Sequence, residues 1–146
     1  MTVVFDAEPL LAFSFDEPGA ADVERWLDRV YDGEVTGYVT TINLAEFRYI
    51  STRKTTVNEA DAHINDLREM GLDIYNVDDL WKMVSDLKAN YNPSIADAFA
   101  LAAAKSLDNN NENDVTLLVG ADTDYDMVEN EDEFQDIIVR FREDAA

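Results

Sequence analysis

Residues 94–104 read SIADAFALAAA, and Asp97 is the only charge among these mostly apolar residues. A helix of this composition has no polar face, so it is expected to be buried on nearly all sides. Ser94 is a favourable N-cap residue, and Asp97 three residues later completes a capping-box pattern with Asp in place of Glu. The stretch therefore predicts a buried helix through Leu107, whose one carboxylate caps the helix, faces a functional site, or does both.

Strand-like and helix-like segments alternate on either side of this helix. Period-2 or fully apolar runs predict strands at residues 2–6, 35–39, 72–75, 115–119 and 137–141. Helical spacing and capping signals predict helices at 7–13, 20–31, 41–52, 77–89 and 94–107, and one more that opens with the capping box at 56–59 and ends at Gly71. A polar loop is expected at 108–114. This order predicts one α/β domain over residues 1–146, a sandwich with a mostly parallel sheet.

The first, second and fourth of these strands read as buried on both faces, as strands of parallel sheets are. Folds of this kind bind ligands beyond the carboxyl ends of their strands. Trp26, Trp81 and Phe99 are expected in the core rather than as platforms for stacked bases.

The composition excludes several kinds of site. There is no cysteine, so disulfides and thiolate metal sites are ruled out, and a single histidine, His63, rules out a histidine-rich zinc site. A Ser-His-Asp triad through His63 has no accompanying nucleophile elbow. Any metal is therefore expected to be held by oxygen ligands, which favours magnesium, manganese or calcium. With no signal peptide and no apolar run of membrane-spanning length, we expect an intracellular, soluble, cytoplasmic protein.

Net charge is the most unusual feature of the sequence. Eleven basic residues stand against 32 acidic ones, for a formal net charge of −21. Self-repulsion on that scale destabilises a compact fold, whereas molar salt shortens the Debye length to about 3 Å and screens it. The acids are spread along the whole chain, which favours adaptation to a very salty cytoplasm. The alternative is an acidic protein that binds a basic partner or mimics nucleic acid.

Three acids stand in surroundings that surface adaptation does not explain. Asp6 ends the first apolar strand, where the alternative is a helix N-cap. Glu46 interrupts the apolar stripe of the helix at 41–52, where the alternative is a pair with a core-facing arginine. Asp97 lies in the apolar helix described above. A buried carboxylate needs a cation or a proton, so each of these positions is a candidate for a functional site.

Further acids follow the strand at 115–119 directly, in the loop GADTDYD at residues 120–126. Because this loop follows a parallel strand, Asp122 and Asp124 are expected at the same sheet edge as Asp6. One alternative is an EF-hand calcium loop, but Met127 stands where that loop requires glycine and a strand precedes it. The other is a plain acidic turn. Carboxylates clustered at one edge are tolerable with divalent cations between them, which can activate water and neutralise a phosphate.

The order and wording of these motifs resemble the PIN-domain family over nearly the whole chain. Residues 4–7, VFDA, are similar to the family's opening motif, and 43–46, NLAE, to its second. Residues 95–102, IADAFALA, are very close to the third, and 117–125, LLVGADTDY, resemble the fourth. The size is that of the VapC-like toxin ribonucleases of VapBC toxin–antitoxin pairs.

This resemblance implies a three-layer α/β/α fold and a Mg²⁺- or Mn²⁺-dependent endoribonuclease that acts on RNA. It also implies a homodimer and a cognate antitoxin. Carried over by position, the acidic quartet that binds metal and catalyses is Asp6, Glu46, Asp97 and Asp122, with Asp124 as a supporting metal-binding acid. The alternatives are a PIN nuclease of RNA processing and a PIN binding module without activity.

Three other positions qualify this assignment. Gly120 stands where the family usually has a hydroxyl residue, so a hydrogen bond near the metal is lost. Asn43 is either a partner that orients Glu46 or an ordinary polar residue at a helix start. Arg53, within the basic cluster of Arg48, Arg53 and Lys54, either contacts an RNA phosphate or lies at a solvated helix end.

Overall fold

The structure is a computed structural model that describes residues 1–110 and 114–144. The polar loop expected at 108–114 lies in part outside these residues, and its first two residues continue the preceding helix. Within the described part of the chain, no helix combines the length and the apolar character that crossing a membrane requires.

A five-stranded sheet forms the middle of the molecule. Its strands are β1 (Thr2–Phe5), β2 (Thr36–Thr40), β3 (Asp73–Tyr75), β4 (Val115–Val119) and β5 (Ile138–Arg140). They lie side by side in the order β3-β2-β1-β4-β5, and every neighbouring pair is parallel. The predicted parallel sheet is therefore confirmed, with all five expected strands in it.

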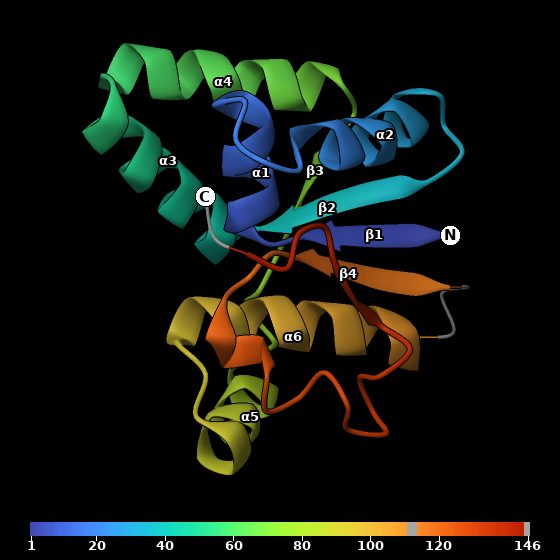
Figure 1. The fold of residues 1–146 in the computed structure, drawn as a ribbon. Helices are drawn as coiled ribbons and strands as arrows, with labels where there is room; N and C mark the ends of the chain where they lie inside the picture. The colour runs from blue at the N-terminus through green and yellow to red at the C-terminus, as the bar shows by residue number, and fades with distance from the viewer. Residues whose placement is uncertain (111–113, 145–146) are drawn as a thin grey trace.

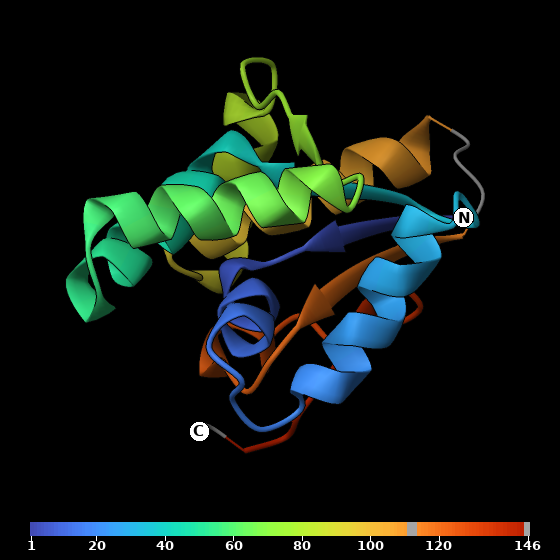
Figure 2. The ribbon, with the colours of Figure 1, turned by 90° about the horizontal axis from the view of Figure 1, so that it is seen from above.

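Helices cover both faces of this sheet. They are α1 (Ala7–Ser14), α2 (Ala20–Tyr31), α3 (Thr41–Lys54), α4 (Val57–Glu69), α5 (Trp81–Tyr91) and α6 (Ile95–Asn109), with a short 3₁₀ helix, η1 (Thr123–Tyr125). Helices α1 to α4 lie on one side of the sheet, and α5 and α6 lie on the other (Figure 1). In the view from above, β1 and β4 lie beneath this helix layer and are visible in the gap between α4 and α2 (Figure 2). The expected three-layer α/β/α fold is thus confirmed.

The two central strands are buried on both faces, which gives the molecule two apolar cores. Along β1, Val4 packs into the core beneath α5 and α6, whereas Val3 and Phe5 pack into the core beneath α1 to α4. β4 is buried along its whole length. The expectation that the second strand is equally buried is wrong at its start, because Thr36 is exposed near the amino end of β2.

The largest error in a predicted helix boundary is at the start of α5, and one predicted core residue is wrong; three predicted helices also run two residues further than expected. The helix expected from residue 77 begins at Trp81, because Asn76 accepts a hydrogen bond from the backbone N–H of Asp78 and Val77 accepts one from Leu80, which makes a turn of this segment. Trp81 is 62% exposed rather than in the core. Trp81 lies in the first turn of α5, where most of the indole is in solvent.

Parallel pairing brings the carboxyl ends of all five strands to one edge. β1 and β4 are direct neighbours, so the residues that follow them start from adjacent points on that edge. The chain after β5 stays there too, because the Phe141 N–H bonds to the Val119 carbonyl and the segment continues beside α1 (Figure 1). This edge holds the residues that the sequence singled out.

Candidate metal centre

Five acids line one pocket at this edge, and four of them are the quartet named from the sequence. Asp6 directly follows β1, Asp122 follows β4 by three residues, and the helices α3 and α6 contribute the other two. The pocket has a volume of about 230 Å³. Its lining residues are Asp6, Ala7, Glu8, Leu11, Glu46, Ile50, Asp97 and Asp122. The structure therefore brings together all four acids of the quartet named from the sequence.

Asp6 both caps a helix and lies in the pocket. Its Oδ1 accepts a hydrogen bond of 2.8 Å from the Ala7 N–H at the start of α1, while the side chain stays 3% exposed. Burial raises the pKa of Asp6 to about 7, the Ala7 hydrogen bond lowers it in part, and repulsion from Glu46 adds to the rise. The capping interpretation and the site interpretation are thus compatible at this residue.

Asp97 is freed from the capping role that its sequence context suggests. The Ser94 hydroxyl accepts from the Asp97 N–H at 3.2 Å, as a capping box requires. The reciprocal contact, however, comes from another residue: the Ser94 N–H donates to Asp124 Oδ2 at 2.8 Å. The Asp97 carboxylate is therefore available to the pocket, and Asp124 ties the loop after β4 to the start of α6.

The Asp97 carboxylate is buried with one oxygen left without a partner. The residue is 3% exposed, and its Oδ2 makes no hydrogen bond within the described residues. Burial and then repulsion from Asp6 raise the pKa of Asp97 to about 10. An unsatisfied buried oxygen of this kind is costly without a cation or a proton.

Tyr125 bridges the two buried carboxylates. Its hydroxyl lies 2.9 Å from Asp6 Oδ2 and 3.2 Å from Asp97 Oδ1, and the ring is fully buried. A phenol carries one proton and can donate it to one carboxylate only. Both contacts are therefore hydrogen bonds when one of the two acids is protonated, which agrees with their raised pKa values in the absence of a cation. The sequence reasoning did not assign a role to Tyr125.

Asn43 holds Asp6 from the opposite side. Its amide donates to Asp6 Oδ1 at 3.3 Å and to the Ala96 carbonyl at 3.2 Å. Its carbonyl oxygen accepts from the hydroxyl of Thr40, the N-cap residue of α3. Asn43 is fully buried, so the interpretation as an ordinary residue at a helix start is wrong. The Asn43 amide donates to Asp6 and to a backbone carbonyl, and its interaction with Glu46 is therefore only one part of its role.

Glu46 and Asp124 complete the set of acids. Burial raises the pKa of Glu46, the nearby Asn43 amide opposes this, and repulsion from Asp122 adds to it. One oxygen from each of Asp97, Asp122 and Asp124 lies within 4.8 Å of the others. Asp97 comes from α6, whereas Asp122 and Asp124 come from the loop and 3₁₀ helix after β4, and all three offer oxygen ligands of the kind that hard divalent cations prefer.

The loop after β4 is no EF-hand. Asp122 and Asp124 group with Asp97 rather than with Asp126, which forms a 2.7 Å ion pair with Arg140. Asp122 also accepts from the backbone N–H of Asp124 as it opens η1. The loop therefore presents its first two acids toward α6.

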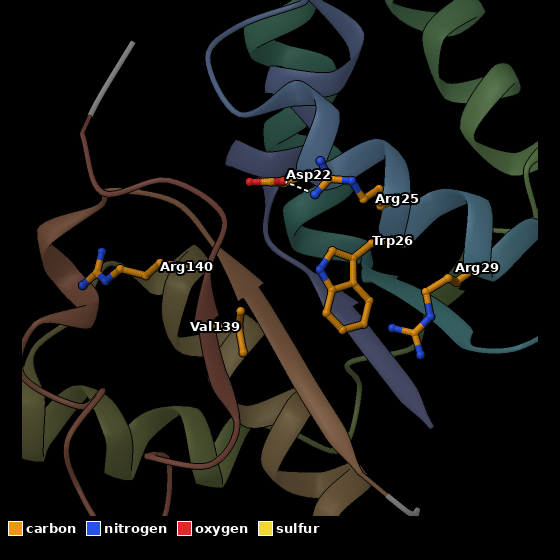
Figure 3. Close-up of a pocket in the computed structure, with 6 residues that line it drawn as sticks. All are labelled: Asp22, Arg25, Trp26, Arg29, Val139 and Arg140. Atoms are coloured by element: carbon orange, nitrogen blue, oxygen red, sulfur yellow. Dashed lines mark hydrogen bonds and ion pairs between the residues drawn. The ribbon is translucent and has the colours of Figure 1, made fainter.

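Arg140, at the end of β5, holds this loop in place, and the sequence reasoning missed it. The side chain is 8% exposed, and its Nη1 donates to the carbonyls of Gly120 at 2.7 Å and of Asp122 at 3.2 Å. Its Nε pairs with Glu129 at 2.7 Å. In Figure 3 the Arg140 guanidinium accordingly points away from the Trp26 side of the neighbouring hollow. An isolated arginine in a short edge strand gives no sequence signal for this role.

With this geometry in place, comparisons with known proteins agree on the family and the fold. The model of the PIN domain matches residues 3–130, and the chain belongs to the PIN-domain family. PIN domains are in general nucleases, and the acidic cluster is present here.

A solved structure of similar fold is the crystal structure of VapBC2 from Rickettsia felis bound to a DNA fragment from their promoter. The TM-score is 0.72 at 12% sequence identity, and the alignment covers 96% of this chain and 98% of the matched chain. No curated protein sequence matches the chain.

Proposed function

We propose that this chain is a divalent-metal-dependent endoribonuclease and the toxin of a VapBC-type pair. The observation that carries the proposal is the buried Asp97 carboxylate, whose Oδ2 lacks a partner within the described residues and lies among other acids. Such an arrangement is stable when a cation is shared between the carboxylates. All the donors are oxygens, which fits Mg²⁺ or Mn²⁺ rather than a softer metal.

Each acid has a place in this proposal. Asp97, Asp122 and Asp124 would hold the cation directly, and Asp6 and Glu46 would complete its surroundings from β1 and α3. When bound, the cation supplies Lewis acidity toward water and charge neutralisation at a phosphodiester. The protein contributes the orientation of the carboxylates and a pocket that is lined from α1, α3 and α6.

Tyr125 and Asn43 act on the acids rather than on the substrate. Tyr125 keeps Asp6 and Asp97 at a constant separation through its hydroxyl, and Asn43 restrains Asp6 from α3. Partners of metal ligands commonly contribute in this way to affinity and activity.

Arg53 is the candidate contact for the RNA backbone. It lies on α3, one turn beyond Ile50, which lines the acid pocket. Of the three cations in this basic cluster, Arg48 pairs with Asp61 and Lys54 with Glu17. Arg53 contacts only the Tyr49 hydroxyl and ring within the described residues, which leaves its charge available to a phosphate.

Assignment to a toxin–antitoxin pair rests on the resemblance of the motifs and on the fold shared with a chain of VapBC2. It carries with it a cognate antitoxin that blocks the site and a homodimer. The excess of acids over bases supports a protein that works in the cytoplasm at high salt. The acidic quartet argues against a binding module without activity, because buried carboxylates such as Asp6 and Asp97 destabilise the fold unless a cation compensates them.

An RNA cleavage assay in molar KCl tests the proposal. We expect Mn²⁺ or Mg²⁺ to support internal cleavage of single-stranded RNA and a chelator to abolish it. RNA binding without cleavage under all these conditions would contradict the proposal and favour a binding module. Co-expression with a small protein encoded beside it would then separate a toxin, which such an antitoxin inhibits, from a nuclease of RNA processing.

A further inference from the structure

Gly120 is a glycine for lack of space rather than for backbone freedom. Its backbone is not among the positive-φ residues, so its conformation suits any L-amino acid. A Cβ built at this position, however, would overlap the carboxylate of Glu8. The Glu8 carboxylate therefore occupies the volume that a side chain at position 120 would take.

Glu8 reaches this position from the first turn of α1, on the same pocket as the acidic quartet. It lines that pocket together with Asp6 and Asp122. Its Oε2 accepts a hydrogen bond from the Ala121 N–H at 2.9 Å and another from Arg142 Nε at 3.0 Å. The carboxylate is thus anchored at the turn that links β4 to Asp122.

Arg142 makes this additional acid tolerable. Its side chain is 10% exposed, and it also donates to the Pro18 carbonyl at 3.1 Å and pairs with Glu17 at 3.5 Å. The arginine comes from the segment after β5, Glu8 lies in the first turn of α1, and Glu17 lies three residues beyond its end. The charge of Glu8 is compensated on one side while the other side lines the pocket.

The turn at 120–122 is consequently held from two directions. Arg140 binds the carbonyls of Gly120 and Asp122, and Glu8 binds the N–H of Ala121 between them. With both contacts in place, the direction in which the Asp122 side chain leaves the turn is restricted. Loss of either contact frees the turn.

We propose that Glu8 is a positioning residue of the metal site, which holds the 120–122 turn so that Asp122 can bind the cation. This rests on the function proposed above, in that it assumes a divalent cation at the acid pocket. Gly120 and Glu8 form one unit in this account: the glycine is present because the glutamate needs its space.

A double-mutant cycle on Mn²⁺ affinity tests this unit. Isothermal titration of the full chain in molar KCl would compare wild type, Glu8→Ala, Gly120→Ala and the double variant, each checked for folding by a melt in chelator. Glu8→Ala is expected to weaken Mn²⁺ binding by about 10-fold or more, the range seen for partners of metal ligands. Gly120→Ala should weaken it similarly, because its methyl group displaces the Glu8 carboxylate.

The coupling between the two substitutions is the decisive quantity. In the Glu8→Ala background, Gly120→Ala should change Mn²⁺ affinity by no more than about twofold, because the carboxylate that it displaces is already gone. An equal cost in both backgrounds would show two independent packing defects and would overturn the proposal. So would a Glu8→Ala variant that binds Mn²⁺ as wild type does.

Glu8→Gln distinguishes a positioning role from direct metal ligation. It also provides a milder variant in case Glu8→Ala does not fold. Its amide oxygen can still accept from the Ala121 N–H, so we expect affinity within about threefold of wild type. Affinity as low as in Glu8→Ala would overturn the positioning role.

Asp97→Asn distinguishes this inference from the function on which it rests. If Asp97→Asn binds weakly while Glu8→Ala binds normally, only the present inference fails. If Asp97→Asn binds as wild type does, the metal site itself is wrong and both fail.

Discussion

Two hollows in the described part of the molecule differ in how their charged residues are paired. One lies between α2 and β5 and is lined by Asp22, Arg25, Trp26, Arg29, Val139 and Arg140 (Figure 3). There Arg25 pairs with Asp22 at 2.5 Å, Arg29 pairs with Glu34 at 3.5 Å, and Arg140 pairs with Glu129. In the acid pocket, by contrast, Asp6 and Asp97 form no ion pair with a basic side chain within the described residues, and their hydrogen bonds come from Tyr125, Asn43 and the Ala7 N–H.

The difference shows what marks a site in a chain with so many acids. Acidic residues are found throughout the sequence, so their number carries little information. Burial without a cationic partner is the distinguishing property, because a desolvated carboxylate is costly unless a cation or proton compensates it. In the arginine-lined hollow each arginine is paired with an acid, whereas Asp6 and Asp97 have no basic partner within the described residues, as the proposed cation site requires.

The largest expected effect comes from removing one charge in the acid pocket. Asp97→Asn should lower RNA cleavage by about 100-fold or more, because the cation loses an anionic ligand. In chelator the same variant should melt at or above the wild-type temperature, since the repulsion with Asp6 is relieved. Asp22→Asn, the same change in the other hollow, is the matched control and should leave both quantities unchanged. Equal cleavage by Asp97→Asn and wild type would remove Asp97 from the metal site.

A second comparison sets one arginine against another. Arg140→Met should destabilise the fold by about 3 kcal/mol, because it leaves the buried partners of a nearly buried guanidinium unsatisfied. Arg25→Met, at an exposed pair, should cost under about 0.5 kcal/mol. Denaturant titrations of both variants in molar KCl measure the two values. Similar costs at the two positions would contradict the role of Arg140 in holding the 120–122 turn.

Salt should act on the whole surface rather than on the pocket. Raising KCl from about 0.1 M to about 2 M should raise the melting temperature by about 5 °C, because screening reduces repulsion among the exposed acids. A potassium-free osmolyte at equal osmolality controls for general solvent effects. A flat or falling melting temperature would contradict adaptation to high salt.

The smallest expected effect is a dependence of stability on pH in chelator. The folded pKa values of Asp6 and Asp97 lie above those of the unfolded chain, so the folded state binds more protons and stability falls as pH rises. The loss begins near the unfolded value of about 4 and continues through about 7 for Asp6 and toward about 10 for Asp97. Melts should therefore show the advantage of Asp97→Asn over wild type growing by about 3 °C from acid to alkaline pH. An advantage that stays constant would mean that Asp97 is not protonated in the metal-free fold.

The sequence predicted the parts of this site that depend on local context. Asp97 stands alone in an apolar helix, Glu46 breaks an apolar stripe, and Asp6 ends a buried strand. Each of these signals lies within one or two turns of chain, and the alternation of strands and helices then predicted a shared edge. The parallel pairing of β1 and β4 places Asp6 and Asp122 at that shared edge.

The missed residues act through contacts between distant parts of the chain. Tyr125 and Asp6 form a hydrogen bond although they are 119 residues apart in the sequence, and Glu8 and Ala121 do so at a separation of 113 residues. Neither contact produces a pattern in the local sequence. Gly120 carried a signal as a departure from the family pattern, yet only the position of the Glu8 carboxylate explains it. The capping box at Ser94 was similarly ambiguous, because Asp124 rather than Asp97 supplies its second contact.

The most direct test is an anomalous diffraction experiment on crystals grown or soaked with Mn²⁺ at high salt. We predict a peak in the acid pocket within about 2.2 Å of carboxylate oxygens of Asp97 and Asp122, and none in the arginine-lined hollow. With the peak in place, Asp97 Oδ2 would have the partner that it lacks among residues 1–110 and 114–144. An acid pocket without a peak at saturating Mn²⁺, or a peak that leaves Asp97 uncoordinated, would contradict the account.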